Sequence, residues 1–116
     1  MNRLLTLGLA VLVLAGCAND PAPGEQMRLS TQAVEQARAV GADQQIEEMH
    51  MAEQKLARAE KNMGEEDYKR ARVFAEQAEL DARLAEAKVL NQKSQKQLDE
   101  LNARITRLRK QLGELP

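Results

Sequence analysis

The stretch that decides the fold runs from residue 66 to residue 112 and reads EDYKRARVFAEQAELDARLAEAKVLNQKSQKQLDELNARITRLRKQL. It contains no glycine and no proline, and the strong helix formers Ala, Glu, Gln, Lys, Arg and Leu dominate it. No segment alternates between apolar and polar residues with the period of a strand. The stretch predicts one helix of about 46 residues, or about 69 Å. We therefore expect an all-α protein built on one long helix.

Alanines recur at heptad spacing through the first half of this helix. They follow one another at intervals of four, three, four and three residues, and the pattern continues to Val89. Small residues at this spacing let a second helix approach closely. This alanine seam, which we expect to face the partner helix of a hairpin, consists of Ala71, Ala75, Ala78, Ala82 and Ala85.

Two glycines divide the chain that precedes the long helix. Gly64 predicts the end of a helix over residues 43–63, with Asp43 as its possible N-cap. Gly41 predicts the end of an earlier helix over residues 29–40, although a lone glycine is also tolerated inside a helix. We expect an antiparallel helical hairpin over residues 27–97, made of two or three helices. The helix over 43–63 offers matching apolar residues at Ile46, Met49, Leu56, Ala59 and Met63.

A second apolar seam begins after the polar stretch at residues 91–97. We call it the leucine seam, and it consists of Leu98, Leu101, Ile105, Leu108 and Leu112, with Leu115 at the next position. Its alternating intervals of three and four residues predict a short coiled coil over residues 98–116. A helix over 43–63 covers the long helix only to about residue 90, so the seam has no partner in its own chain. Exposed apolar stripes of this kind mark interaction sites. We expect contact with a second copy or with a partner coiled coil in the cell envelope.

The N-terminus has the pattern of an export signal. A short basic region ending at Arg3 precedes a 12-residue run, Leu4 to Ala15, that is apolar except for Thr6. In a helix this run spans about 18 Å, which is too short for a bilayer core of about 30 Å. A secretory signal over residues 1–16 fits this length better.

The residues Leu14-Ala15-Gly16-Cys17 close this run and resemble the lipobox of bacterial lipoproteins. The resemblance implies cleavage between Gly16 and Cys17, with diacylglycerol and an N-acyl chain attached to Cys17. Cys17 is the only cysteine. Because Ala18 follows it instead of Asp, the resemblance favours the periplasmic leaflet of the outer membrane over the inner membrane. Residues 17–26, with Pro21 and Pro23, then predict a flexible tether.

A second resemblance rests on ARAEKNMGEEDYKRA at residues 57–71 and FAEQA at residues 74–78. Together with the lipobox, these motifs resemble a group of small alanine-rich helical lipoproteins of Gram-negative bacteria that is catalogued only as a domain of unknown function. The likeness covers residues 26–89. It implies a helical hairpin and an envelope lipoprotein, with no assigned activity.

The residue types argue against catalysis. The mature chain has one histidine and few hydroxyl residues, none with a base at a convincing helical offset. The carboxylates lie on helices and often pair with basic residues four positions away, as in solvated helix faces. We expect no enzyme activity, no small-molecule substrate and no cofactor besides the lipid on Cys17.

Metal and nucleic acid are disfavoured for separate reasons. On a helix, Met49 and Met51 point about 200° apart, so they cannot hold one soft metal ion together with His50. We expect no metal site. The basic residues Arg104, Arg107, Arg109 and Lys110 flank a coiled coil, and the mature chain carries 16 basic against 18 acidic residues. We expect no nucleic-acid partner.

Two functions fit the whole sequence. The first is a lipid-anchored scaffold or tether that contacts another helix through the leucine seam. The second is a periplasmic holdase-like chaperone, or a regulator of an envelope enzyme or transporter, whose apolar stripe binds helical segments of its clients.

Overall fold

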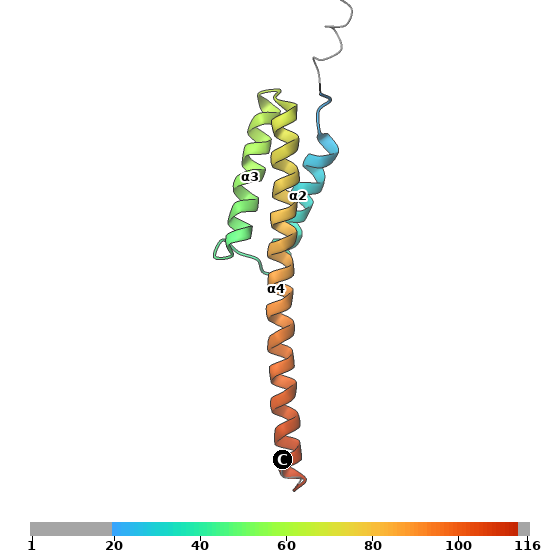
Figure 1. The fold of residues 1–116 in the computed structure, drawn as a ribbon, viewed down its shortest axis with the longest axis vertical. Helices are drawn as coiled ribbons and strands as arrows, with labels where there is room; N and C mark the ends of the chain where they lie inside the picture. Colours follow the sequence, from blue (N-terminus) through green and yellow to red (C-terminus); the bar gives the residue numbers. More distant parts are fainter. Residues whose placement is uncertain (1–19, 114–116) are drawn as a thin grey trace, which may run out of the picture.

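A computed structural model of the protein describes residues 20–113. This part of the chain contains three helices, α2 (Gly24–Ala39), α3 (Glu47–Gly64) and α4 (Tyr68–Gln111), and no strand. Helix α4 has 44 residues, or about 66 Å. The predicted all-α fold with a long C-terminal helix is confirmed, and Figure 1 shows its extended shape.

The first half of α4 is packed between two shorter helices (Figure 1). Helix α3 runs antiparallel to it, with Lys55 Nζ 2.5 Å from Asp81 Oδ2. Helix α2 runs parallel to it on the other side, where Gln26 donates a hydrogen bond to Glu79 at 2.7 Å. The chain therefore folds back at Gly41, and the hairpin has three helices. We call α2, α3 and α4 as far as Val89 the body.

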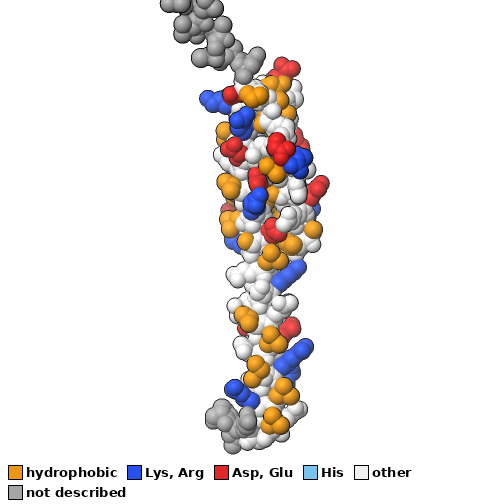
Figure 2. Space-filling view, turned by 90° about the vertical axis from the view of Figure 1, so that its right-hand side faces the viewer, with side chains coloured by type: hydrophobic (Ala, Val, Ile, Leu, Met, Phe, Trp, Pro, Cys, Tyr) orange, Lys and Arg blue, Asp and Glu red, His pale blue; other side chains and the backbone are white. Residues whose placement is uncertain are grey.

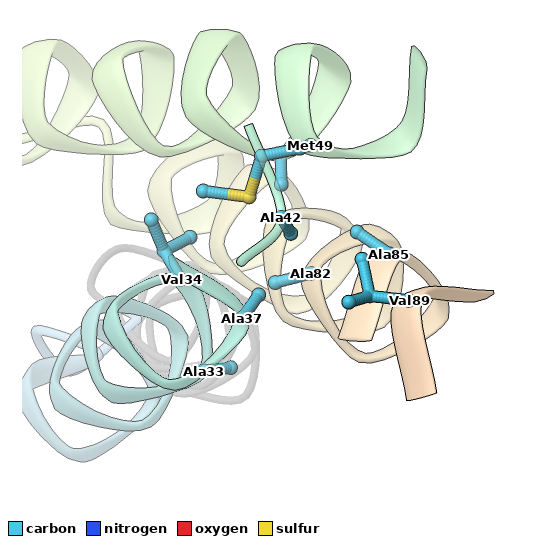
Figure 3. Close-up of a cluster of buried hydrophobic side chains, with 9 residues drawn as sticks. Ala33, Val34, Ala37, Ala42, Met49, Ala82, Ala85 and Val89 are labelled. Atoms are coloured by element: carbon cyan, nitrogen blue, oxygen red, sulfur yellow. The ribbon is translucent and has the colours of Figure 1, made fainter. Parts of the chain in front are cut away.

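Alanine makes most of the core of the body. The cluster of buried side chains in Figure 3 joins all three helices and the loop after α2. Its members are Ala33, Val34, Ala37, Ala42, Met49, Ala52, Ala82, Ala85 and Val89. The largest fully buried side chains are Met49 and Ser30. The Ser30 hydroxyl lies within hydrogen-bonding distance of the carbonyl oxygens of Gln26 and Met27, 3.0 Å from each. Since small side chains fill this core, the helices lie close together.

Helices α2 and α3 end in the same hydrogen-bonding motif. After α2, the amides of Gly41 and Ala42 bond to the carbonyls of Arg38 and Ala37, both at 2.9 Å. Gly41 has φ 101°. This is a Schellman motif, whose left-handed position glycine fills without strain. After α3, the same position is filled by Glu66 at φ 61°, so Gly64 is the last helical residue instead of the left-handed one.

Two helix starts differ from the sequence prediction. Helix α2 begins at Gly24, not near residue 29, so the predicted tether over residues 17–26 is too long at its C-terminal end. Its first turn is held by the bond from Met27 N–H to the Pro23 carbonyl and by packing on α4. Helix α3 begins at Glu47, because Asp43 accepts a hydrogen bond from Gln45 in a turn and does not cap the helix.

The second half of α4 extends beyond the body. Val89 is the last buried residue, and every residue from 90 to 113 is exposed. We call residues 90–113 the overhang. Helix α2 begins near the end of α4 that is remote from the overhang (Figure 1). The described N-terminus and the overhang therefore lie at opposite ends of the molecule.

Candidate functional site

The leucine seam lies on the overhang, exposed along its length. Its five side chains are between 47% and 76% exposed, with Leu112 the most exposed. Neither α2 nor α3 reaches this part of α4. From Leu98 to Leu112, about four turns of helix thus present an apolar stripe about 21 Å long, with no partner in the described chain. A stripe at heptad spacing can dock one further helix.

Charge is divided unevenly between the two halves of the molecule. The overhang has six basic and two acidic side chains, a net charge of +4. Residues 20–89 have ten basic and fifteen acidic side chains, a net charge of −5. In Figure 2 the lower part of the molecule shows apolar and basic side chains next to one another. The apolar stripe therefore lies in a basic surrounding.

The alanine seam lies in the body. All five of its alanines, and with them Val89, face inward, and the alanines have no exposed surface. Methyl groups at these positions let α2 and α3 approach α4 closely. The role of this seam is to hold α2 and α3 against α4, which fixes the base from which the overhang extends.

Ion pairs join the helices around the alanine core. Lys88 donates to Glu48 across α3 and α4, and the hydrogen bond from Lys88 lowers the pKa of Glu48. Arg38 donates to Glu53 at 2.7 Å across α2 and α3, and this bond lowers the pKa of Glu53. These carboxylates have structural partners and do not gather into a catalytic cluster.

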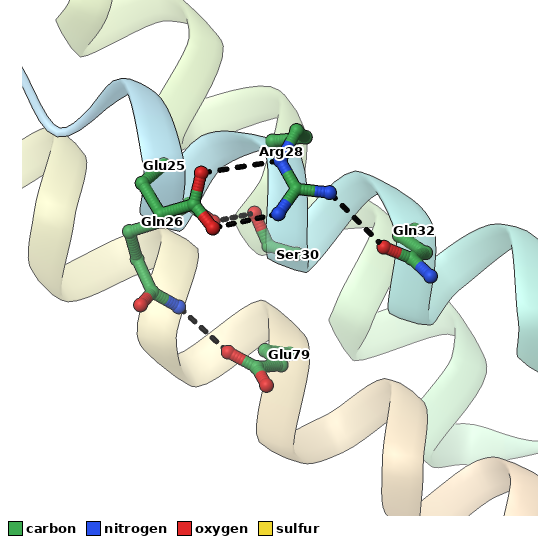
Figure 4. A network of polar contacts seen from close by, with 6 residues as sticks. All are labelled: Glu25, Gln26, Arg28, Ser30, Gln32 and Glu79. Carbon is green, nitrogen blue, oxygen red and sulfur yellow. Dashed lines mark hydrogen bonds and ion pairs between the residues drawn. The ribbon is translucent and has the colours of Figure 1, made fainter.

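Glu79 lies at the centre of a polar network between α2 and α4, drawn in Figure 4. It accepts hydrogen bonds from Gln26 at 2.7 Å and from Arg83 at 2.6 Å. The bond from Gln26, followed by that from Arg83, holds the pKa of Glu79 below its ordinary value. On the outer side of α2, Arg28 donates to Glu25 and lowers the pKa of that carboxyl as well.

The methionine and histidine side chains of α3 do not converge. Met49 is fully buried in the core, whereas Met51 is exposed and His50 shares a hydrogen bond of 3.0 Å with Gln54. Among residues 20–113, no three His, Cys, Asp or Glu side chains lie together as a metal site. No helix of the described part is long and apolar enough to cross a bilayer.

An open hollow marks the junction of the body and the overhang. It has a volume of about 730 Å³ and lies between α4 and the loop that joins α2 to α3. Lys93 crosses it and donates to the Val40 carbonyl at 2.5 Å, so that a cation closes the C-terminus of α2. Val89 and Ile46 line it beside Lys96 and Asp99. This lining of apolar and charged side chains fits a role in holding the loop after α2 against α4.

The predicted lipidation and cleavage residues, Cys17 and Gly16, lie outside the described residues. The same holds for Leu115, the final position of the seam.

Sequence reasoning missed two sets of residues. The first is the inner face of α2, where Ser30, Ala33, Val34 and Ala37 are buried at the spacing of one helix face. The second is a group of exposed apolar side chains on the outside of the body, Val73, Leu80 and Leu84. The interval between Val73 and Leu80 is one heptad, and Leu84 lies four residues further on. The sequence shows this spacing, but the spacing does not indicate which face of α4 the helices α2 and α3 leave exposed to solvent.

Comparisons with known proteins agree with this architecture. Residues 25–101 match a family model described as a domain of unknown function, DUF4398. The chain is also similar to the crystal structure of a DUF4398 family protein from Pseudomonas aeruginosa PAO1, with 62% sequence identity and a TM-score of 0.79. That match covers 81% of this chain and 98% of the crystallised one. No curated protein matches the chain.

Proposed function

This chain belongs to the DUF4398 family, and from that premise we propose that it is a non-enzymatic interaction protein of the cell envelope, anchored by lipid on Cys17 to the periplasmic leaflet of the outer membrane. The family description assigns no activity. The proposal therefore rests on the geometry of the overhang and on the lipobox.

The observation that carries the proposal is the position of the leucine seam. It is exposed, and it lies at the end of α4 that is remote from the N-terminus. A chain held by its N-terminus presents this seam away from the anchor. From Tyr68, the seam begins after about 45 Å of helix at Leu98 and extends to about 66 Å. The body acts as the base, and the overhang acts as the arm that reaches a partner.

The mechanism is helix–helix contact at a set distance from the membrane. Two acyl chains or more on Cys17 give stable anchoring, because each buried methylene contributes about 0.8 kcal/mol. The leucine seam then forms a coiled coil with a second copy or with an envelope partner. The −5 charge of residues 20–89 gives this body no attraction to anionic lipid surfaces.

Metabolic labelling tests the anchor. Cells that make the wild-type protein and cells that make Cys17→Ala are grown with labelled palmitate. We expect label and membrane fractionation for the wild type, and neither for Cys17→Ala. Unlabelled wild-type protein would refute the anchored part of the proposal. Sucrose-gradient separation of the labelled membranes then distinguishes the outer from the inner membrane.

Photocrosslinking in cells tests the contact. A crosslinking amino acid replaces Leu101 on the leucine seam, and in the control it replaces Met51, which is exposed on α3. We expect one or a few discrete products from position 101 and none from position 51. A broad set of products from position 101 favours the holdase-like chaperone. Equal yields from the two positions would refute a role of the seam.

A further inference from the structure

The leucine seam continues onto the outside of the body. When the seam is lettered as heptads, Leu98 takes position a and Leu101 takes position d. Counting back in sevens puts Leu84 at a and both Val73 and Leu80 at d. These three side chains are between 45% and 66% exposed. The exposed apolar residues of both halves of α4 therefore belong to one register.

The two seams of α4 lie on different faces. In the same lettering, the buried alanines occupy positions b and f, which lie away from a and d. Helices α2 and α3 pack on the b and f face, so they leave the a and d face open to solvent (Figure 1). From Val73 to Leu112 this open face extends for about 59 Å. We call it the outer seam.

The outer seam is complementary to an antiparallel copy of itself. In an antiparallel pair of helices, each a residue of one helix lies opposite a d residue of the other. In one alignment Leu84 lies opposite Leu101 of the second copy, which fixes every other layer. The other layers pair Val73 with Leu112, Gln77 with Leu108, Leu80 with Ile105, Ala87 with Leu98 and Asn91 with Ser94. Only Gln77 then meets a side chain of a different character.

The polar stretch selects this alignment. Asn91 and Ser94 lie on either side of the two-fold axis, so each meets the other across it, and both are exposed in the single copy. Sliding the second copy by one heptad brings Leu84 opposite Ser94 in one direction, or Leu101 opposite Asn91 in the other. A polar residue at an a position fixes register, because other registers place it against apolar side chains. One alignment is therefore favoured.

Charges beside the outer seam complement one another in the same alignment. In an antiparallel pair, g residues face g residues and e residues face e residues. Glu76, which is exposed on the body, meets Arg104 on the overhang of the second copy. Asp81 meets Arg109, although Asp81 also accepts a bond from Lys55 at 2.5 Å. Both contacts occur twice by symmetry, so they join the −5 body of each copy to the +4 overhang of the other.

The same flanks disfavour a parallel pair. In that orientation each g residue faces the e residue five positions later. Glu76 would face Asp81, and Arg104 would face Arg109; like charges opposite one another are destabilising. The antiparallel pair brings no like charges together. Its remaining flanking contacts are Lys69 with Gln111, Arg83 with Gln97, Lys88 with Asn102, and Leu90 and Gln95 each with its own equivalent. Charge therefore selects the antiparallel orientation.

The two bodies leave room for this pairing. Val89 is the last buried residue of α4, and it comes level with residue 96 of the second copy. Measured on α4, the two bodies therefore end about 10 Å apart. Each body faces only the overhang of the other copy, which is a bare helix. The pairing thus covers the exposed apolar side chains of both halves of α4 together.

We propose that the outer seam docks a second copy of this chain in antiparallel orientation, with Leu84 opposite Leu101 and Glu76 beside Arg104. The inference deepens the proposed function and rests on it, because it names the partner of the leucine seam. A foreign helix needs no such symmetry, whereas α4 matches its own antiparallel copy in both layers and flanking charges. The two lipid anchors then lie at opposite ends of the pair, so within one leaflet each arm reaches along the membrane to a neighbouring copy.

Disulfide trapping tests the orientation. The chain is used from Ala18 to Pro116, which lacks Cys17 and contains the described core. Leu84→Cys and Leu101→Cys are oxidised separately and as a mixture. We expect a disulfide-linked dimer from the mixture alone, because position 84 of one copy meets position 101 of the other. The two 101 positions of an antiparallel pair are about 25 Å apart, beyond the reach of a disulfide. A disulfide from either variant alone would overturn this orientation.

Sedimentation equilibrium tests the partner and the extent of the contact. We expect the chain from Ala18 to Pro116 to form a dimer. Leu84→Asp and Leu101→Asp place a carboxylate on the two halves of the outer seam, and each should raise the dissociation constant at least about tenfold. Gln54→Asp, at an exposed position of α3, should leave it unchanged. An unchanged dimer of Leu84→Asp would overturn the continuation onto the body.

A charge exchange tests the ion pairs at low salt. Arg104→Glu and Glu76→Arg should each raise the dissociation constant at least about fivefold, because like charges then face one another. Mixing the two variants should restore tight binding, since every altered residue then meets the opposite charge on the other chain. Arg107→Glu is the matched control at position c, which faces away from the contact. Equal effects of Arg104→Glu and Arg107→Glu would overturn the pairing of charges.

Other outcomes overturn the inference in distinguishable ways. A monomer at all concentrations, with a discrete crosslink from position 101 to another protein in cells, makes a foreign helix the partner; the inference then fails while the proposed function stands. A monomer whose position 101 gives no specific crosslink refutes the proposed function as well. A trimer or a larger assembly overturns the two-fold pairing.

Discussion

Methyl groups set the spacing of the helices in the body. The alanine seam of α4 is fully buried, and Ala37 of α2 and Ala52 of α3 are fully buried as well. A core with so little side-chain volume has no flexible residue that could move aside for a larger one, apart from Met49. The close approach of the three helices therefore depends on the smallness of each of these residues.

Enlarging one of these alanines should destabilise the protein. We expect Ala82→Leu to lower the free energy of unfolding by about 1–3 kcal/mol, because the added carbons overpack the core. Urea denaturation followed by circular dichroism measures the change. Ala87→Leu is the matched control, since Ala87 is exposed on the same helix. A similar loss in both variants would contradict the packing explanation.

Carboxylates that join the helices should make stability depend on pH. Hydrogen bonds hold the pKa values of Glu48, Glu53 and Glu79 below their ordinary value of 4.5. Their contribution is therefore fully present above about pH 4.5 and is lost as the pH falls through the lower folded-state values. We expect the melting temperature to fall steeply in that acidic range.

A substitution at Glu79 identifies the group responsible. Glu79→Gln cannot titrate, so its melting temperature should fall less between pH 5 and acidic pH than that of the wild type. Glu60→Gln, on an exposed position of α3, should follow the wild-type curve. Thermal melts of the three proteins at several pH values measure this difference. Parallel curves for all three would refute the assignment to Glu79.

At the scale of the helices, the two Schellman motifs differ in the residue type at the left-handed position. Gly41 occupies the left-handed position after α2 at φ 101°, whereas Glu66 occupies it after α3 at φ 61°. A residue with a side chain is strained in this conformation by about 1 kcal/mol. The turn after α3 therefore stores strain that the turn after α2 avoids.

Exchanging the residue type should change stability in opposite directions at the two positions. We expect Gly41→Ala to lower the free energy of unfolding by about 1 kcal/mol and Glu66→Gly to raise it by up to about as much. Chemical denaturation of both variants beside the wild type provides the test. Destabilisation by Glu66→Gly would show that the Glu66 side chain contributes more than its backbone strain costs.

The sequence predicted the helices better than their ends and packing. Uninterrupted helix formers predicted α4 nearly to the residue, because no competing signal lies between Asp67 and Leu112. The start of α2 was missed, because Pro23 and Gly24 resemble a linker until packing against α4 makes them the first turn. The return of the chain at Gly41 stayed open, because the alternatives differ in packing and not in local propensity.

At the scale of the molecule, one helix passes from a packed body into solvent. The overhang gains helical stability only from its own propensity and from being continuous with the folded half. In a single copy, at low protein concentration, we expect amide hydrogens of residues 98–111 to exchange at least about a hundredfold faster than those of residues 75–89. Hydrogen exchange followed by mass spectrometry measures both segments. Equal protection would mean that the seam is already paired, as in a self-associated form.

The candidate site was predictable only in part. Heptad spacing predicted the leucine seam, and helix lengths predicted that α3 cannot cover it. The part of the outer seam on the body, at Val73, Leu80 and Leu84, could not be assigned from spacing. Those residues are equally consistent with a buried face until the positions of α2 and α3 show which side of α4 stays open.

Substitutions on the two faces of α4 are constrained by different contacts. Which substitutions are tolerated at Ala82 depends on residues of the same chain, since its neighbours are in α2 and α3. A change at Leu101 or Arg104 alters nothing in the chain itself, so the helix that docks on the exposed face decides whether it persists. Compensating substitutions for the buried face should therefore be found at residues in contact within one copy. Compensating substitutions for the exposed face should be found in the sequence of the partner. Covariation across genomes can therefore identify that partner, and for a second copy it should couple Glu76 with Arg104.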